Sequence, residues 1–202
     1  MKLFARSGLI ASLVLALFGL VEPAQAAPGP SEVIRGFYEV LLDNMKNAQA
    51  LGIKGRYAKL EPVVFEDFDV PFMSRLSVGT AWSTLGADKK QALVKAFGRY
   101  IATTYATQFD GYSGEQLKVD GEQVIKHATL VKSQIVKSNG EPVQINYLLH
   151  DNDQRWQIRD IYLAGTISQL ATRRSEFSSI MKGQGIDKLI SVLNEKADAL
   201  QN

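Results

Sequence analysis

Apolar and polar positions follow two different periods along this chain of 202 residues. Between Ser31 and Phe109, apolar residues recur every three or four positions, which is the spacing of helices with one buried face. From Glu115 onwards they recur every second position, which is the spacing of strands with one buried face. The pattern therefore predicts a group of helices that comes before a sheet along the chain.

The helical part centres on a long amphipathic helix that begins at Asp88 and ends before the turn Asp110-Gly111. Its residues at helical spacing, which we expect to form the buried stripe, are Leu93, Phe97, Tyr100, Ile101, Thr104, Tyr105 and Phe109. The lysines and Arg99 on the other side indicate a solvated face. The part of the chain that follows is expected to form a sheet that packs against this helix.

Shorter helices are expected ahead of it. The first runs from Ser31 to a stop before Gly52, and a basic loop at 54–57 separates it from a second helix over 57–68. Asp69 is placed to cap a third helix, because its carboxylate can accept a hydrogen bond from a free backbone N–H. Gly79 is expected to end that third helix.

Four segments have the strand period, over 116–125, 128–137, 143–150 and 155–163. Asn139-Gly140 favours a tight hairpin turn, and strands joined by tight turns pair antiparallel. In the third segment the odd-numbered apolar residues all point one way, so helices should cover one face of the sheet. Two closing helices, over 167–182 and 186–200, complete an expected α+β fold with about five to seven helices.

The N-terminus has the pattern of a secretory signal peptide. Lys2 and Arg6 precede an uncharged run over 8–21, and Ala24-Gln25-Ala26 is a small-x-small cleavage pattern. The run is shorter than the roughly 20 residues that span a bilayer, which argues against a membrane anchor. We therefore expect a signal peptide over 1–26, a single domain over 27–202, and export to the periplasm.

The composition limits the kinds of chemical site that the chain can form. The chain has no cysteine, so disulfide and thiolate chemistry are excluded, and its formal net charge of +2 is too small to indicate a nucleic-acid partner. His127 and His150 lie on separate expected strands, without the three or four ligands of a metal site. We expect no metal, no cofactor and no serine-hydrolase site, since the sequence has no Gly-x-Ser-x-Gly motif.

Large apolar side chains are numerous for a single layer of helices on four strands. They are Phe37, Phe68, Phe72, Met73, Trp82, Phe97, Tyr100, Tyr105, Phe109, Tyr147, Trp156 and Tyr162. They can form an ordinary packed core, or they can line a dry cavity that accepts a lipid tail. Periodicity alone does not separate these two interpretations.

One block of sequence resembles a known family. Phe68-Asp69, Met73, Arg75, Gly79 and Trp82 have the spacing F-D-x-x-x-M-x-R-x-x-x-G-x-x-W of the MlaC family of periplasmic lipid carriers, also called the toluene-tolerance auxiliary family. The similarity continues at 104–106, 112–114, 156–160 and 185–190. The stretch 51–57 is similar to the hopanoid-biosynthesis-associated branch called HpnM.

The resemblance implies a twisted antiparallel four-stranded sheet wrapped by helices, with a deep apolar pocket between them. It implies a monomeric, non-enzymatic carrier that holds the acyl chains of a phospholipid or a hopanoid-like lipid. It also implies a shuttle that helps to maintain the lipid asymmetry of the outer membrane. Its partners would be an inner-membrane ABC transporter complex and an outer-membrane lipoprotein–porin complex.

On this hypothesis we expect ten residues to line the pocket: Met73, Leu76, Trp82, Phe97, Ile101, Tyr105, Val131, Ile145, Tyr147 and Leu149. Arg75 is the candidate for the lipid head group, because it stands on an otherwise apolar helix. Two alternatives stay open. One is an enzyme acting on a small apolar substrate through Arg75, Asp160 or His127, and the other is a periplasmic adaptor with a solid core.

Overall fold

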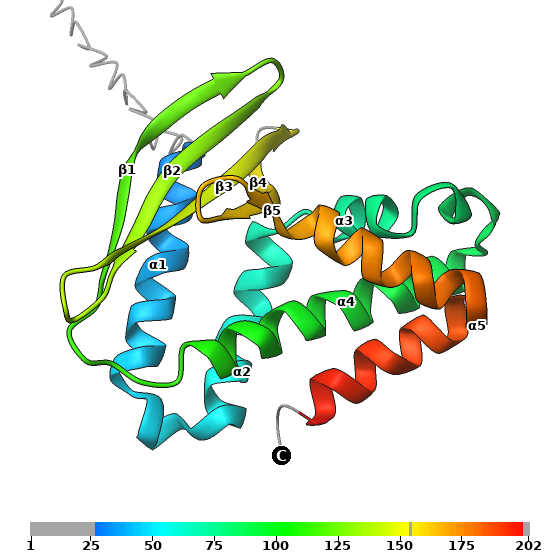
Figure 1. The fold of residues 1–202 in the computed structure, drawn as a ribbon, viewed down its shortest axis with the longest axis horizontal. Helices are drawn as coiled ribbons and strands as arrows, with labels where there is room; N and C mark the ends of the chain where they lie inside the picture. Colours follow the sequence, from blue (N-terminus) through cyan, green and yellow to red (C-terminus); the bar gives the residue numbers. More distant parts are fainter. Residues whose placement is uncertain (1–26, 154, 200–202) are drawn as a thin grey trace, which may run out of the picture.

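The sheet is built from strands that pair in the order in which they occur along the chain (Figure 1). The structure is a computed structural model that describes residues 27–153 and 155–199; the expected signal peptide lies outside the described residues. The strands are β1 (Gln116–Ile125), β2 (Ala128–Val136), β3 (Pro142–Asn152), β4 (Arg155–Leu163) and β5 (Ile167–Ser168). All pairings between them are antiparallel, which confirms the expected α+β fold.

The fifth strand was not expected from the sequence. β5 has two residues, which pair with Tyr162 and Leu163 of β4. We expected a helix to begin at Ile167, and this was wrong. The backbone of Ile167 and Ser168 pairs with β4, and the helix begins only at Gln169. A two-residue strand is too short to give an alternating pattern, so periodicity could not reveal it.

The expected alternation in β3 is confirmed. Ile145, Tyr147 and Leu149 are buried, whereas Gln144 is exposed. The β2–β3 hairpin turns at Asn139-Gly140, where Gly140 has a φ of 86°, a conformation that glycine adopts without the steric cost of a Cβ atom. One face of the sheet therefore carries the core.

The helices pack against that face and against one another. They are α1 (Pro30–Lys46), α2 (Ala48–Asp67), α3 (Val70–Val78), α4 (Ala87–Gln108) and α5 (Gln169–Ala199), with a 3₁₀ helix η1 (Gly79–Thr84) after α3. In Figure 1, α1 lies along the sheet, while α4 and α5 extend away from it side by side. In the described part of the chain, no helix has the length and the apolar character that a membrane crossing needs.

The basic loop expected at 54–57 is helical instead. α2 continues through it, after a break at Gly52, where φ is 57° and ψ is −178°. Arg56 is buried, and its Nε donates to the Ala106 carbonyl at 2.8 Å while its Nη1 donates to the Ala48 carbonyl at 2.9 Å. These hydrogen bonds tie the end of α4 to the start of α2, which is why a basic residue here does not mark a solvated loop.

Helix boundaries elsewhere follow the capping residues. The Asp69 carboxylate accepts a hydrogen bond from the Phe72 N–H at 3.0 Å, and Gly79 ends α3 with a φ of 61°, as expected. α4 begins one residue earlier than expected, at Ala87. The break expected between the two closing helices is confirmed at Gly185, where φ is 78° and the direction of α5 changes.

Candidate functional site

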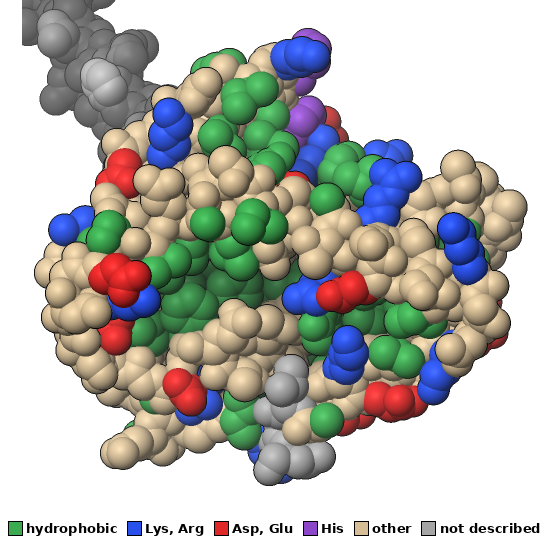
Figure 2. All heavy atoms as spheres, viewed as in Figure 1, with side chains coloured by type: hydrophobic (Ala, Val, Ile, Leu, Met, Phe, Trp, Pro, Cys, Tyr) green, Lys and Arg blue, Asp and Glu red, His purple; other side chains and the backbone are tan. Residues whose placement is uncertain are grey.

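A cavity lies between α4, the sheet and the first turns of α5. Its volume is about 130 Å³, and about 780 Å³ of space is free of atoms when the part open to solvent is counted. Figure 2 shows apolar side chains gathered in a hollow between the sheet and α4. The large side chains noted in the sequence therefore leave a space between helices and strands instead of filling it.

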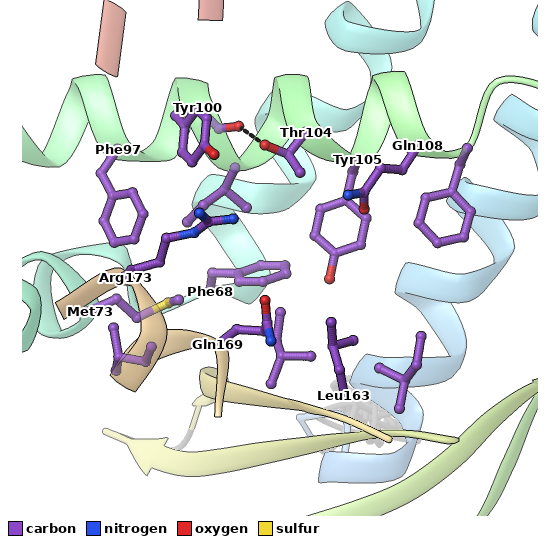
Figure 3. Close-up of a pocket in the computed structure, with 15 residues that line it drawn as sticks. Phe68, Met73, Phe97, Tyr100, Thr104, Tyr105, Gln108, Leu163, Gln169 and Arg173 are labelled. Carbon is purple, nitrogen blue, oxygen red and sulfur yellow. Dashed lines mark hydrogen bonds between the residues drawn. The ribbon is translucent and has the colours of Figure 1, made fainter. Parts of the chain in front are cut away.

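One face of α4 forms a wall of this cavity (Figure 3). It contributes Phe97, Tyr100, Ile101, Thr104, Tyr105 and Gln108, at the spacing of a single helix stripe. An adjacent side of α4 packs closely on α2, where the ring of Phe65 lies over Gly98. This close contact restricts rotation of α4 and so fixes the orientation of its cavity face.

The other walls come from three different parts of the chain. Phe68 and Met73 come from the α2–α3 region, and Ile145, Ile161 and Leu163 come from the sheet. Gln169, Leu170 and Arg173 come from the first turns of α5. The cavity therefore lies where helices and strands that are far apart in the sequence meet.

Phe68 is held in the cavity wall by backbone contacts on both sides. It forms an isolated parallel bridge with Ile158 of β4, and the N–H of Asp69 donates to the Ile158 carbonyl at 2.9 Å. Asp69 then caps α3 and accepts a hydrogen bond from Nε of Arg159. The Phe-Asp pair of the motif therefore attaches the start of α3 to the sheet.

The floor of the cavity is aromatic. Phe37 meets Phe68 and Tyr105 edge to face, with ring centroids 5.4 Å and 5.1 Å apart, and Phe109 stacks on Tyr105 at 5.7 Å. Such arrangements suit the positive edges and negative faces of aromatic rings. They also bury a large apolar area directly beneath the cavity.

The tyrosine hydroxyls beneath the cavity stay neutral. Burial raises the pKa of Tyr105 above its usual range, and burial likewise raises the pKa of Tyr147. Tyr38, which packs edge to face on Tyr147, shares a hydrogen bond of 2.7 Å with the Ser133 hydroxyl. No charge is therefore placed at this end of the cavity by these three side chains.

Polar groups stand where the cavity meets solvent. We call Gln108, Gln169 and Arg173 the polar rim; each lines the cavity and is partly or fully exposed. Thr104 also lines the cavity, but its hydroxyl donates to the Tyr100 carbonyl at 2.7 Å, so its donor is already used. An apolar interior with a polar rim suits a ligand that has one apolar end and one polar end.

The structure brings five of the ten residues expected to line a pocket to this cavity. They are Met73, Phe97, Ile101, Tyr105 and Ile145. The other five lie elsewhere. Val131, Tyr147 and Leu149 are fully buried in the core under the sheet, Leu76 is 39% exposed on α3, and Trp82 lies in η1 with Lys90 over its ring.

The stripe of α4 could have revealed further lining residues. Tyr100, Thr104 and Phe109 belong to the stripe recognised in the sequence, and they line the cavity together with the three expected residues of α4. Residues of α5 and of the end of β4 were missed, because no local pattern tells which buried positions face a space and which face a neighbour.

The charged candidates from the sequence do not meet at the cavity. Arg75 is exposed on α3, with its guanidinium carbon 5.3 Å from the centroid of the Phe72 ring. His127 is exposed in the β1–β2 turn. Asp160 accepts hydrogen bonds from the N–H groups of Ile161 and Leu170 and from the Ser168 hydroxyl, so its carboxylate stabilises the junction between β4 and α5.

Comparison with known proteins gives a matching family, a similar relative and a similar solved structure. The family model for the MlaC protein matches residues 37–195. The intermembrane phospholipid transport system binding protein MlaC of Haemophilus influenzae is 22% identical over 197 residues, which cover 93% of this chain and 91% of the relative. A phospholipid-binding protein from Ralstonia solanacearum, solved in complex with a phospholipid, has a TM-score of 0.75 at 17% identity, covering 87% of this chain and 100% of that one.

Proposed function

Because this chain belongs to the MlaC family, we propose that it is a periplasmic lipid carrier that encloses acyl chains in the cavity between α4, α5 and the sheet. On this proposal, residues 27–202 act as a single lipid-binding domain after removal of a signal peptide over 1–26. The cargo is a phospholipid, with a hopanoid-like lipid as the alternative. The protein moves its cargo and does not transform it.

The observation that carries the proposal is the apolar cavity itself. It is lined mainly by aromatic and aliphatic side chains, and it opens to solvent past a polar rim. An adaptor with a solid core would not need such a space, because packing voids weaken a core. The phospholipid in the Ralstonia solanacearum structure of the same fold supports the same conclusion.

The energy of transfer gives a reason to enclose the cargo. Burial of each CH₂ group of an acyl chain is worth about 0.8 kcal/mol, so roughly 15 buried groups contribute about 12 kcal/mol. A lipid therefore does not leave a membrane for water at a useful rate unless its tail is covered. A dry cavity between helices and strands provides that cover.

The present volume accepts only part of a lipid tail. An apolar cavity of about 150 Å³ in another protein binds benzene, and the cavity of this protein is of similar size, at about 130 Å³. A complete acyl chain thus requires the walls to move apart. The first part of α5 is the wall best suited to move, because Gly185 breaks the helix beyond it.

The membrane partners belong to the same proposal. We infer that the carrier receives or delivers lipid at an inner-membrane ABC transporter complex and at an outer-membrane lipoprotein–porin complex. The support for this is family membership together with the name of the Haemophilus influenzae relative, which assigns that protein to an intermembrane phospholipid transport system.

Lipid extraction tests the proposal directly. The protein is purified from its native host, its lipids are extracted with organic solvent, and they are weighed by mass spectrometry against a blank from an unrelated periplasmic protein. We expect stoichiometric lipid with two acyl chains or a hopanoid skeleton. Protein that is lipid-free when purified, and that takes up no amphiphile after delipidation, would contradict the proposal.

A further inference from the structure

Arg173 places a positive charge at the edge of an apolar cavity. Among the described residues that line this cavity, it is the one with a formal charge, and 25% of its side chain is exposed. A guanidinium in such a position is partly desolvated, which makes its interaction with an anion stronger than at an open surface.

The guanidinium of Arg173 is positioned from two sides. Its carbon lies 5.2 Å from the centroid of the Tyr100 ring, and its Nη1 donates to Oε2 of Glu176 at 2.9 Å. Figure 3 shows Arg173 reaching from α5 towards Tyr100 on α4. The side chain is therefore held across the gap between the two helices that border the cavity.

Arg173 keeps donors for a further partner. An arginine has five N–H donors, and within the described part of the chain one of them is used, by Glu176. Gln169, one helical turn earlier on α5, adds an amide to the same rim. Lys196 adds a second positive charge nearby, with its Nζ 5.9 Å from the Tyr100 centroid.

We propose that Arg173 binds the phosphate of an amphiphile whose apolar chain occupies the cavity. This inference rests on the proposed function and deepens it, because it names the residue that recognises the phosphate of the cargo. The planar fork of an arginine matches two phosphate oxygens at once. The rim position lets the phosphate keep water on its outer side, so binding does not require complete desolvation of the anion.

Two other arginines provide matched controls. Arg174 is the next residue of α5, but it lines a separate groove beside Gly79. Arg75, the head-group candidate from the sequence, is exposed on α3 and does not line the cavity. Substitution of either to Gln removes the same charge as Arg173→Gln without a change to the rim.

The test compares two lipids with identical acyl chains, one with phosphate and one without. Delipidated wild type, Arg173→Gln, Arg174→Gln and Arg75→Gln are each titrated with phosphatidylglycerol and with diacylglycerol, and bound lipid is counted by native mass spectrometry. We expect Arg173→Gln to bind phosphatidylglycerol about ten-fold more weakly, as for a partly exposed charge-assisted contact, with diacylglycerol binding unchanged. Arg174→Gln and Arg75→Gln should match the wild type, and Arg173→Lys should recover part of the loss.

Each contrary result has a distinct meaning. If wild type takes up neither lipid, the proposed carrier function itself fails. If wild type takes up both and Arg173→Gln weakens both equally or neither, the head-group assignment to Arg173 is wrong while the carrier function stands. Inorganic phosphate that binds alone as tightly as phosphatidylglycerol would overturn the assignment of this anion site to a lipid.

Discussion

Arg159 of β4 donates from its Nε to Oδ2 of Asp69 at 2.8 Å, and the two side chains are only 19% and 8% exposed. The other carboxylate oxygen of Asp69 accepts the N–H of Phe72 and so caps α3. The guanidinium carbon of Arg159 also lies 4.3 Å from the centroid of the Phe72 ring. One carboxylate thus fixes the start of a helix and its attachment to the sheet, beside the cavity residue Phe68.

The two roles of Asp69 can be separated by substitution. Asp69→Asn keeps a cap oxygen but loses the ion pair, and we expect it to lower the free energy of unfolding by roughly 1–2 kcal/mol. Asp69→Ala also loses the cap and leaves Arg159 unpaired, and we expect it to lower the free energy of unfolding by roughly 2–4 kcal/mol. Urea unfolding followed by circular dichroism measures both. Equal losses for the two variants would argue that the cap contributes nothing.

The contact between Gly98 and Phe65 predicts a steric effect. A methyl group at Gly98 would overlap the Phe65 ring, so Gly98→Ala should destabilise the protein by roughly 1–3 kcal/mol. Phe65→Leu in the same chain should restore part of the loss, since the smaller side chain leaves room for the methyl group and Phe65 is already 37% exposed. Gly36→Ala is the control: it has open space in α1 and should stabilise by about 0.4–1 kcal/mol.

Asp67 predicts a dependence of stability on pH. Burial, together with the neighbouring Glu66 and partly offset by Arg155, raises the pKa of Asp67 to about 6. The folded state thus favours the protonated carboxyl more than the unfolded state does. The stabilisation of the folded state by protonated Asp67 is fully present below pH about 4, and it is lost as the pH rises through about 6.

Asp67→Asn should therefore remove this decline of the free energy of unfolding with rising pH. At pH 7 we expect the variant to be more stable than the wild type by on the order of 1 kcal/mol, a value reduced because the carboxylate is partly solvated. Urea midpoints measured from pH 4 to pH 8 test this. The control is Asp110→Asn at an exposed position, and a decline of equal size in Asp67→Asn and wild type would refute the prediction.

Filling the cavity should block uptake without unfolding the protein. Thr104 lines the cavity, and in the variant Thr104→Phe the phenylalanine ring would enter a space of about 130 Å³. We expect a stability change of at most roughly 1–2 kcal/mol and a severalfold loss of bound lipid in the titration described above. Lys95→Phe, on the exposed face of the same helix, should bind lipid normally. Full uptake by Thr104→Phe would place the cargo elsewhere.

Local patterns in the sequence were enough to predict most of the elements. β1 and β4 have the expected bounds, because alternation and turn residues act within a few positions. The loop expected at 54–57 was wrong for a tertiary reason: Arg56 is buried in α2 and donates to the Ala106 carbonyl at the end of α4, as well as to the Ala48 carbonyl at the start of its own helix. A local sequence window contains no information about a partner as distant as Ala106.

The candidate site was harder to predict than the fold. Burial and cavity lining have the same local pattern, so Tyr147 and Leu149 could not be distinguished from Ile145, although only Ile145 lines the cavity. No local pattern in the sequence sets Arg173 apart, because its place at the rim depends on the packing of α5 against α4. Only the tertiary arrangement separates it from Arg174.

The strand order has a consequence for folding kinetics. Each strand pairs with the next one along the chain, so the sheet closes only short loops at a low entropic cost. The helices α1 to α4 come before the sheet along the chain. Their apolar faces stay exposed to water until the strands have formed the sheet on which these faces pack. During synthesis from the N-terminus, we expect a nascent chain that ends before β4 to be the species most in need of a chaperone.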